Sequence, residues 1–70
     1  MATGLQKLQA HIHALGVKRE KIRRALVAER AELYPDETTI EALERNFGII
    51  DQQIEQYQAR VDKALNGSST

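Results

Sequence analysis

The 70-residue sequence contains no cysteine and no tryptophan, only one proline, and only three aromatic residues, Tyr34, Phe47 and Tyr57. Without cysteine, neither a disulfide nor a metal site with thiolate ligands can stabilise the fold. A chain of this length buries only about 60% of the surface that it exposes when unfolded, so its core is marginal on its own. Regular helix packing and self-association remain as the sources of stability.

The sequence also lacks an excess of either charge and any long apolar run. Ten basic and ten acidic residues give a formal net charge of zero, so the overall balance favours neither a nucleic acid nor a membrane surface as partner. No segment approaches the roughly 18 apolar residues of a membrane-spanning helix. The first residues lead directly into an amphipathic pattern without the regions typical of a signal peptide, and we therefore expect a cytoplasmic protein.

Residue sets that carry catalysis are absent as well. The only serines lie at positions 68 and 69, and the sequence has neither a nucleophile–base set nor a glycine-rich phosphate loop. His11 and His13 are two residues apart, which places them on different sides of a helix rather than on one metal ion. A pair of helices also has little room for a catalytic pocket. We therefore expect no enzymatic activity, no cofactor, no metal and no small-molecule substrate.

Apolar residues recur in alternating steps of three and four in both halves of the chain. In the first half, the pattern holds if Arg19 and Glu29 occupy two of the positions, and in the second half it is uninterrupted. The predicted seam consists of Leu5, Leu8, Ile12, Leu15, Arg19, Ile22, Leu26, Glu29 and Leu33, followed by Ile40, Leu43, Phe47, Ile50, Ile54, Tyr57, Val61 and Ala64. A period of 3.5 residues over four heptads is typical of a coiled coil and excludes strands.

Capping and helix-breaking residues mark the ends of these patterns. Thr3 with Gln6, and Thr38 with Glu41, have the spacing of a capping box at a helix N-terminus. Pro35 disfavours the helical conformation of the residue before it and therefore stops the first helix.

The predicted fold is all-α, an antiparallel coiled-coil-like hairpin of two helices in a single domain over residues 1–70. We expect helices at about 4–33 and 38–65, a turn at 34–37, and a frayed tail at 66–70. Helices of equal length joined by a short connection favour the antiparallel arrangement. Because two helices bury little apolar surface, we expect the hairpin to dimerise into a four-helix bundle, unless a second protein completes the bundle instead.

Two glycines lie inside the predicted helices, where glycine costs up to about 1 kcal/mol relative to alanine. We hypothesise that Gly16 and Gly48 allow the helices to approach closely or leave room for the ring of Tyr57. A higher melting temperature of the Gly16→Ala or Gly48→Ala protein would refute this hypothesis.

Charge separates between the two helices although the chain is neutral. Residues 5–33 carry seven basic and three acidic residues, and residues 36–65 carry seven acidic and three basic residues, so the helices have net charges of +4 and −4. Opposite charges favour pairing of the two helices within one hairpin. A functional interpretation is a basic patch that contacts phosphate groups or an acidic partner. The patch consists of Lys18, Lys21, Arg23 and Arg24.

Arg19 interrupts the seam, and folding the chain at its proline brings it within reach of Asp51 or Glu55. One interpretation is that its long side chain extends out of the seam to a carboxylate of the other helix. The other is that Arg19, Glu29, Asp51 and Glu55 fix the register or the oligomeric state. An Arg19→Leu protein with unchanged oligomer mass and register would exclude the second interpretation.

These features favour a small protein–protein interaction module, such as an adaptor, a co-chaperone or a regulatory subunit, that acts through helix-face contacts. In length and topology the chain resembles the plasmid-encoded Rop-type hairpins, which dimerise into a four-helix bundle and bind paired RNA loops. The resemblance implies an alternative function, an RNA-binding dimer that uses Lys18, Lys21, Arg23 and Arg24. It rests on architecture and carries over no residue role, because a fold does not by itself confer a function.

Overall fold

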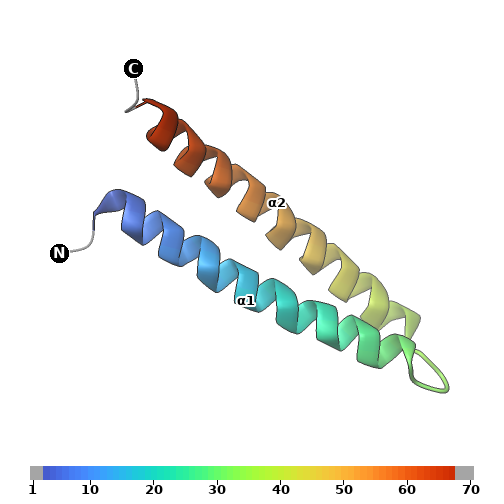
Figure 1. The fold of residues 1–70 in the computed structure, drawn as a ribbon. Coiled ribbons are helices and arrows are strands. Elements are labelled where there is room, and N and C mark those ends of the chain that lie inside the picture. Colours follow the sequence, from blue (N-terminus) through green and yellow to red (C-terminus); the bar gives the residue numbers. More distant parts are fainter. Residues whose placement is uncertain (1–2, 68–70) are drawn as a thin grey trace.

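The computed structural model describes residues 3–67, which form two helices joined by a short turn (Figure 1). Helix α1 spans Gly4–Arg30 and helix α2 spans Glu37–Gly67. The helices run antiparallel, so the start of α1 and the end of α2 lie at the same end of a rod that measures 56 × 22 × 14 Å (Figure 1). The predicted all-α hairpin is confirmed.

Helix α1 begins with the predicted capping box. The side-chain oxygen of Thr3 accepts a hydrogen bond from the backbone N–H of Gln6 at 3.1 Å, and the Gln6 side chain accepts one from the Thr3 N–H at 2.9 Å. The two bonds satisfy backbone donors that the first helical turn would otherwise leave open.

The connection between the helices starts earlier than predicted, because α1 ends at Arg30 rather than near residue 33. The side chain of Glu29 turns toward the connection, where its Oε1 accepts a hydrogen bond from the backbone N–H of Asp36 at 2.9 Å. The chain therefore leaves the helix a full turn before Pro35. As a consequence Leu33, predicted as a seam residue, is 83% exposed.

The N-terminal cap of α2 also differs from the prediction. Oδ1 of Asp36 accepts hydrogen bonds from the backbone N–H groups of Thr38 at 3.0 Å and Thr39 at 3.3 Å. Asp36 is thus the capping residue, and the predicted box of Thr38 with Glu41 is wrong because Thr38 already lies inside the first turn. Helix α2 continues to Gly67, two residues beyond its predicted end, and positions 68–70 of the predicted tail lie outside the described residues.

The predicted seam forms the contact between the helices. Its most buried residues are Leu26, Ile40, Ile50 and Val61. The remaining seam residues are half-buried, apart from Leu33 and Ala64, which are exposed. Even Val61 keeps 3% of its surface exposed, and none of the residues in the described range is completely buried. The core of a single hairpin is therefore one thin layer of side chains.

The hypothesis that Gly16 and Gly48 serve the packing of α1 on α2 is wrong. A methyl group added at either position would meet no side chain and no part of the opposite helix within 4 Å. Neither close approach of the helices nor room for the Tyr57 ring therefore requires these glycines.

Candidate interaction surfaces

The charged residues of the hairpin sort onto two sides of the seam. With Leu5 and Ile40 at position a of their heptads, positions b and e lie on one side, and positions c and g lie on the other. All carboxylates of α2 fall at b and e, which we call the carboxylate side. They are Glu37, Glu41, Glu44, Asp51, Glu55 and Asp62.

The opposite side of the hairpin is basic. All lysines of the chain and one arginine fall at positions c and g, which we call the lysine side. They are Lys7, Lys18, Lys21, Arg60 and Lys63. Neither described helix places a carboxylate at c or g. The charge separation predicted between the two helices is thus accompanied by a separation between the two sides of the rod.

Ion pairs between the helices lie on the carboxylate side. Nη1 of Arg19 lies 2.6 Å from Oδ1 of Asp51, which is one of the two partners expected from the sequence. Arg30 forms an ion pair with Glu44. Arg19 therefore extends out of the seam to a carboxylate of α2, as the first interpretation of this residue expects. Its role in oligomeric state stays a prediction.

The other residues proposed to fix the register lie apart from this pair. Glu29 accepts its hydrogen bond from the turn and not from a side chain of α2. Glu55 is exposed and takes part in none of the ion pairs found between residues 3 and 67.

The structure divides the basic patch predicted on α1. Arg23 donates two hydrogen bonds to Glu20, one of them from Nε to Oε2 at 2.8 Å, and Nε of Arg24 lies 3.4 Å from Oε1 of the same carboxylate. The hydrogen bond from Arg23 is the main reason that the pKa of Glu20 falls to about 2, and the Glu20 carboxylate in turn raises the pKa of Arg23. Lys18 and Lys21 form no ion pair with any carboxylate in the described part of the chain. Two residues of the patch are thus neutralised locally, and two remain available.

The two lysines of this patch lie at different hollows of the surface. Lys18 borders a hollow between the helices together with Asn46 and Gln53 of α2. Lys21 borders a shallow hollow on α1 itself, near Arg24 and Glu20. This division follows from the helix geometry, because residues three apart point about 60° apart around the axis, so Lys18 and Lys21 share one side of the rod but not one hollow.

The sequence reasoning missed a cluster of His11, Tyr57 and Arg60 on the lysine side, near the end of the rod where α1 begins and α2 ends. The rings of His11 and Tyr57 meet edge to face, with centroids 4.9 Å apart and an interplanar angle of 84°. The guanidinium of Arg60 lies 5.2 Å from the centre of the Tyr57 ring. The heptad register carried the signal, since it places all three residues at neighbouring positions of the antiparallel pair.

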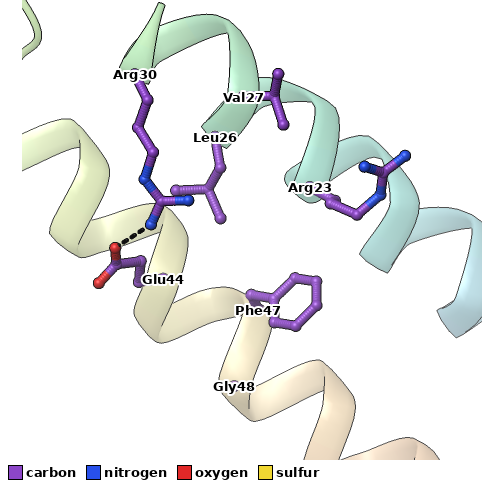
Figure 2. Close-up of a pocket in the computed structure, with 7 residues that line it drawn as sticks. All are labelled: Arg23, Leu26, Val27, Arg30, Glu44, Phe47 and Gly48. Carbon is purple, nitrogen blue, oxygen red and sulfur yellow. Dashed lines mark hydrogen bonds and ion pairs between the residues drawn. The ribbon is translucent and has the colours of Figure 1, made fainter.

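On the carboxylate side, an open groove of about 350 Å³ leads to the seam. It is lined by Arg23, Leu26, Val27, Arg30, Glu44, Phe47 and Gly48. Leu26 of α1 and Phe47 of α2 project into the space between the helices, and Arg30 reaches across to Glu44 (Figure 2). Gly48 contributes no side chain and so leaves this end of the groove open.

The tip of the hairpin presents a second apolar surface. Leu33 and Tyr34 are 83% and 88% exposed, and they stand beside Pro35 in the turn. The stretch 31–44 contains no basic residue. It contains five carboxylates, those of Glu32, Asp36, Glu37, Glu41 and Glu44.

Within residues 3–67, no group of three or more histidine, aspartate or glutamate side chains is placed to hold a metal ion. Neither of the two helices described combines the length and the hydropathy that crossing a membrane requires. Comparisons with protein-family models, with curated proteins and with solved structures found no match to this chain.

Proposed function

We propose that the protein is a small, non-enzymatic interaction module whose hairpin pairs with a second copy of itself to form a four-helix bundle. The groove over Leu26 and Phe47 carries this proposal, because it leaves the edge of the thin core open to solvent. Covering that groove removes further apolar surface from water, at about 25 cal/mol for each Å² buried. A second hairpin carries the same groove, so one contact covers the exposed edge of both cores.

The charges around the groove favour a second copy over an unrelated helix. The rim carries Arg23 and Arg30 on α1 and Glu44 on α2, so both signs of charge occur on one surface, although Arg30 already pairs with Glu44 and Arg23 with Glu20 inside each hairpin. A two-fold dimer brings the same surface of both copies together and therefore needs a self-complementary surface. When α1 of one copy lies over α2 of the other, basic residues face acidic ones. The lysine side would instead place like charges opposite each other, which is unfavourable.

Two glutamate substitutions at exposed valines test the proposal. Val27 lines the groove and is 56% exposed, whereas Val17 lies outside the groove on the same helix and is 46% exposed. The two changes are alike in chemistry and in helix propensity, so Val17→Glu is a matched control. Sedimentation of the wild-type and Val17→Glu proteins at micromolar concentration should give twice the 7.9 kDa of one chain. The Val27→Glu protein should remain helical by circular dichroism but sediment as a monomer.

Three outcomes would contradict the proposal. A folded wild-type monomer at this concentration would exclude the dimer and leave a different protein as the completing partner. A Val27→Glu protein that stays dimeric while Val17→Glu dissociates would move the interface away from the groove. Equal dissociation of both variants would show that the groove is not selectively used.

The lysine side favours a second candidate function, binding of RNA by the dimer. Its cations lie on a side without carboxylates, so none of them is neutralised there by a neighbour. RNA retention should fall steeply with added salt, because each phosphate contact releases counterions. The Lys18→Gln/Lys21→Gln protein should lose this retention, and the Arg23→Gln/Arg24→Gln protein should keep most of it, since both arginines already bind Glu20. Absence of retention even at low salt would exclude this function.

A further inference from the structure

The apolar residues at the tip contribute nothing to the core of the hairpin. Leu33 and Tyr34 are the two most exposed large hydrophobic residues in the described chain, and Tyr34 is one of only three aromatic residues in the protein. Scattered exposed apolar residues are ordinary on protein surfaces. Here two of them are adjacent in the sequence and precede a proline, and all three lie in the turn that joins α1 to α2 at the end of the rod (Figure 1).

Hydrogen bonds fix the backbone on both sides of these residues. Before them, the Glu32 N–H donates to the carbonyl of Glu29 at 3.1 Å. After them, the Asp36 N–H donates to the Glu29 side chain at 2.9 Å, and the Asp36 carbonyl accepts from the Ile40 N–H at 3.0 Å. The carboxylate of Asp36 caps α2 as well. A segment held in place in this way loses less conformational freedom when it binds a partner.

The charge around the tip restricts which kinds of partner molecule can bind there. The stretch 31–44 carries five carboxylates and no basic residue. Arg30, just before it, pairs with Glu44, and Arg45 directly after the stretch supplies a single positive charge. Against that charge, four carboxylates lie outside the described ion pairs, those of Glu32, Asp36, Glu37 and Glu41. Such a surface repels the phosphates of nucleic acids and of anionic lipids. It complements a protein surface on which lysine or arginine surrounds an apolar pocket.

We propose that Leu33, Tyr34 and Pro35 dock into an apolar pocket of a partner protein whose rim carries lysine or arginine. Tyrosine is among the residue types that dominate binding energy at protein interfaces. The inference rests on the proposed function as an interaction module, and it names the kind of partner that module would take. Leu33, Tyr34 and Pro35 do not line the groove at Leu26, so the docking surface and the proposed dimer contact consist of different residues.

The test uses the full chain and a synthetic 14-residue amphipathic peptide that has a leucine stripe flanked by lysines. A peptide with glutamates in place of the lysines is the charge control. Binding is measured by calorimetry, and the contact surface is mapped by the amide shifts of residues 32–34, 36 and 37, since Pro35 has no backbone N–H. The Leu33→Ala/Tyr34→Ala protein should bind the lysine peptide at least tenfold more weakly than the wild type. The Val17→Ala/Ile49→Ala protein, which also loses two exposed apolar residues, should bind as the wild type does.

Several results would overturn the docking proposal. These are no binding of the lysine peptide, equal binding of the glutamate peptide, or binding that the tip substitutions leave unchanged. Amide shifts at the tip caused by an RNA duplex or by phosphatidylserine vesicles would also overturn it, because they would assign the tip to a phosphate ligand. Sedimentation of the wild-type protein separates the two proposals: a wild-type dimer that fails to bind the lysine peptide contradicts the docking inference alone, whereas a wild-type monomer that binds it through the tip contradicts the dimer alone.

Discussion

Leu26 and Leu33 occupy the same heptad position one repeat apart, yet Leu26 is 7% exposed and Leu33 is 83% exposed. Leu26 lies in a regular helix, where the seam stripe faces Phe47 of α2. Leu33 lies in the tip, where hydrogen bonds to Glu29 and Asp36 set the path of the chain. The comparison shows that a heptad pattern predicts burial only as far as the backbone remains helical. Apolar packing organises the seam, and polar groups organise the tip.

The same leucine-to-alanine change at both positions tests this comparison most strongly. Leu26→Ala should lower the free energy of unfolding by about 2–4 kcal/mol, because it removes buried methyl groups and leaves a cavity. Leu33→Ala should change it by less than about 0.5 kcal/mol, since an exposed side chain loses little on truncation. Urea denaturation followed by circular dichroism measures both. A similar loss in the two proteins would show that the tip packs against the core in solution.

Removing the cap tests whether polar groups hold the tip. Asp36→Ala should destabilise the protein by about 1 kcal/mol, because the first turn of α2 loses its acceptor for two backbone N–H groups. Thr38→Ala is the matched control, as the sequence predicts that residue to be the cap. It should cost less than about 0.5 kcal/mol, because alanine is a good helix former inside the first turn. A larger loss of stability from Thr38→Ala than from Asp36→Ala would show that Thr38, and not Asp36, caps α2.

The regular part of the fold was predictable from the sequence. Period and capping chemistry are local properties, so they predicted two helices, the Thr3 box and nearly the whole seam. Counting residues outward from the proline also placed Arg19 within reach of Asp51 or Glu55, and the structure pairs it with Asp51. The tip could not be predicted in the same way. Its path depends on a hydrogen bond between Glu29 and Asp36, seven residues apart, and no periodic signal marks such a bond.

The surface charges were only partly predictable. Proximity in sequence grouped Lys18, Lys21, Arg23 and Arg24 into one patch, but helix geometry spreads them around the axis, and Glu20 captures both arginines. The two sides of the hairpin become apparent only when the heptad positions of both helices are compared in antiparallel register. That comparison needs no structure, and it would have found the lysine side from the sequence.

Alanine substitutions of the two glycines inside α1 and α2 test how closely the regular helices pack. Gly48→Ala and Gly16→Ala should each raise the free energy of unfolding by up to about 1 kcal/mol, because alanine favours the helix and open space surrounds both positions. Thermal melts in the monomeric Val27→Glu background measure this gain for the hairpin alone. If Gly48→Ala is stabilising there but destabilising in the dimer, a partner helix approaches closely at the groove. If Gly48→Ala lowers the stability of both the wild-type and the Val27→Glu protein, α1 and α2 of one hairpin pack more closely than in the structure.

The smallest expected change in stability concerns Glu20, whose carboxylate binds Arg23 and Arg24 within helix α1. Its pKa in the folded protein is about 2, below the ordinary value of 4.5, mainly because Arg23 donates to it. A carboxyl with a lowered pKa stabilises the fold fully above pH 4.5, and that contribution disappears as the pH falls through about 2. The side chain is 42% exposed, so solvent and salt screen the interaction and keep it small.

Melting temperatures of the wild-type and Glu20→Gln proteins between pH 7 and pH 2 test this expectation. The wild type should melt slightly higher at neutral pH, and the gap should close as the pH falls from about 4.5 to about 2. Adding 1 M salt at pH 7 should narrow the same gap, because the pair is only partly shielded from solvent. Glu55→Gln serves as the control, since Glu55 takes part in none of the described ion pairs. The difference in melting temperature between the wild type and Glu55→Gln should be smaller than that for Glu20→Gln. A Glu20 gap that is independent of pH would mean that the arginine cluster does not form in solution.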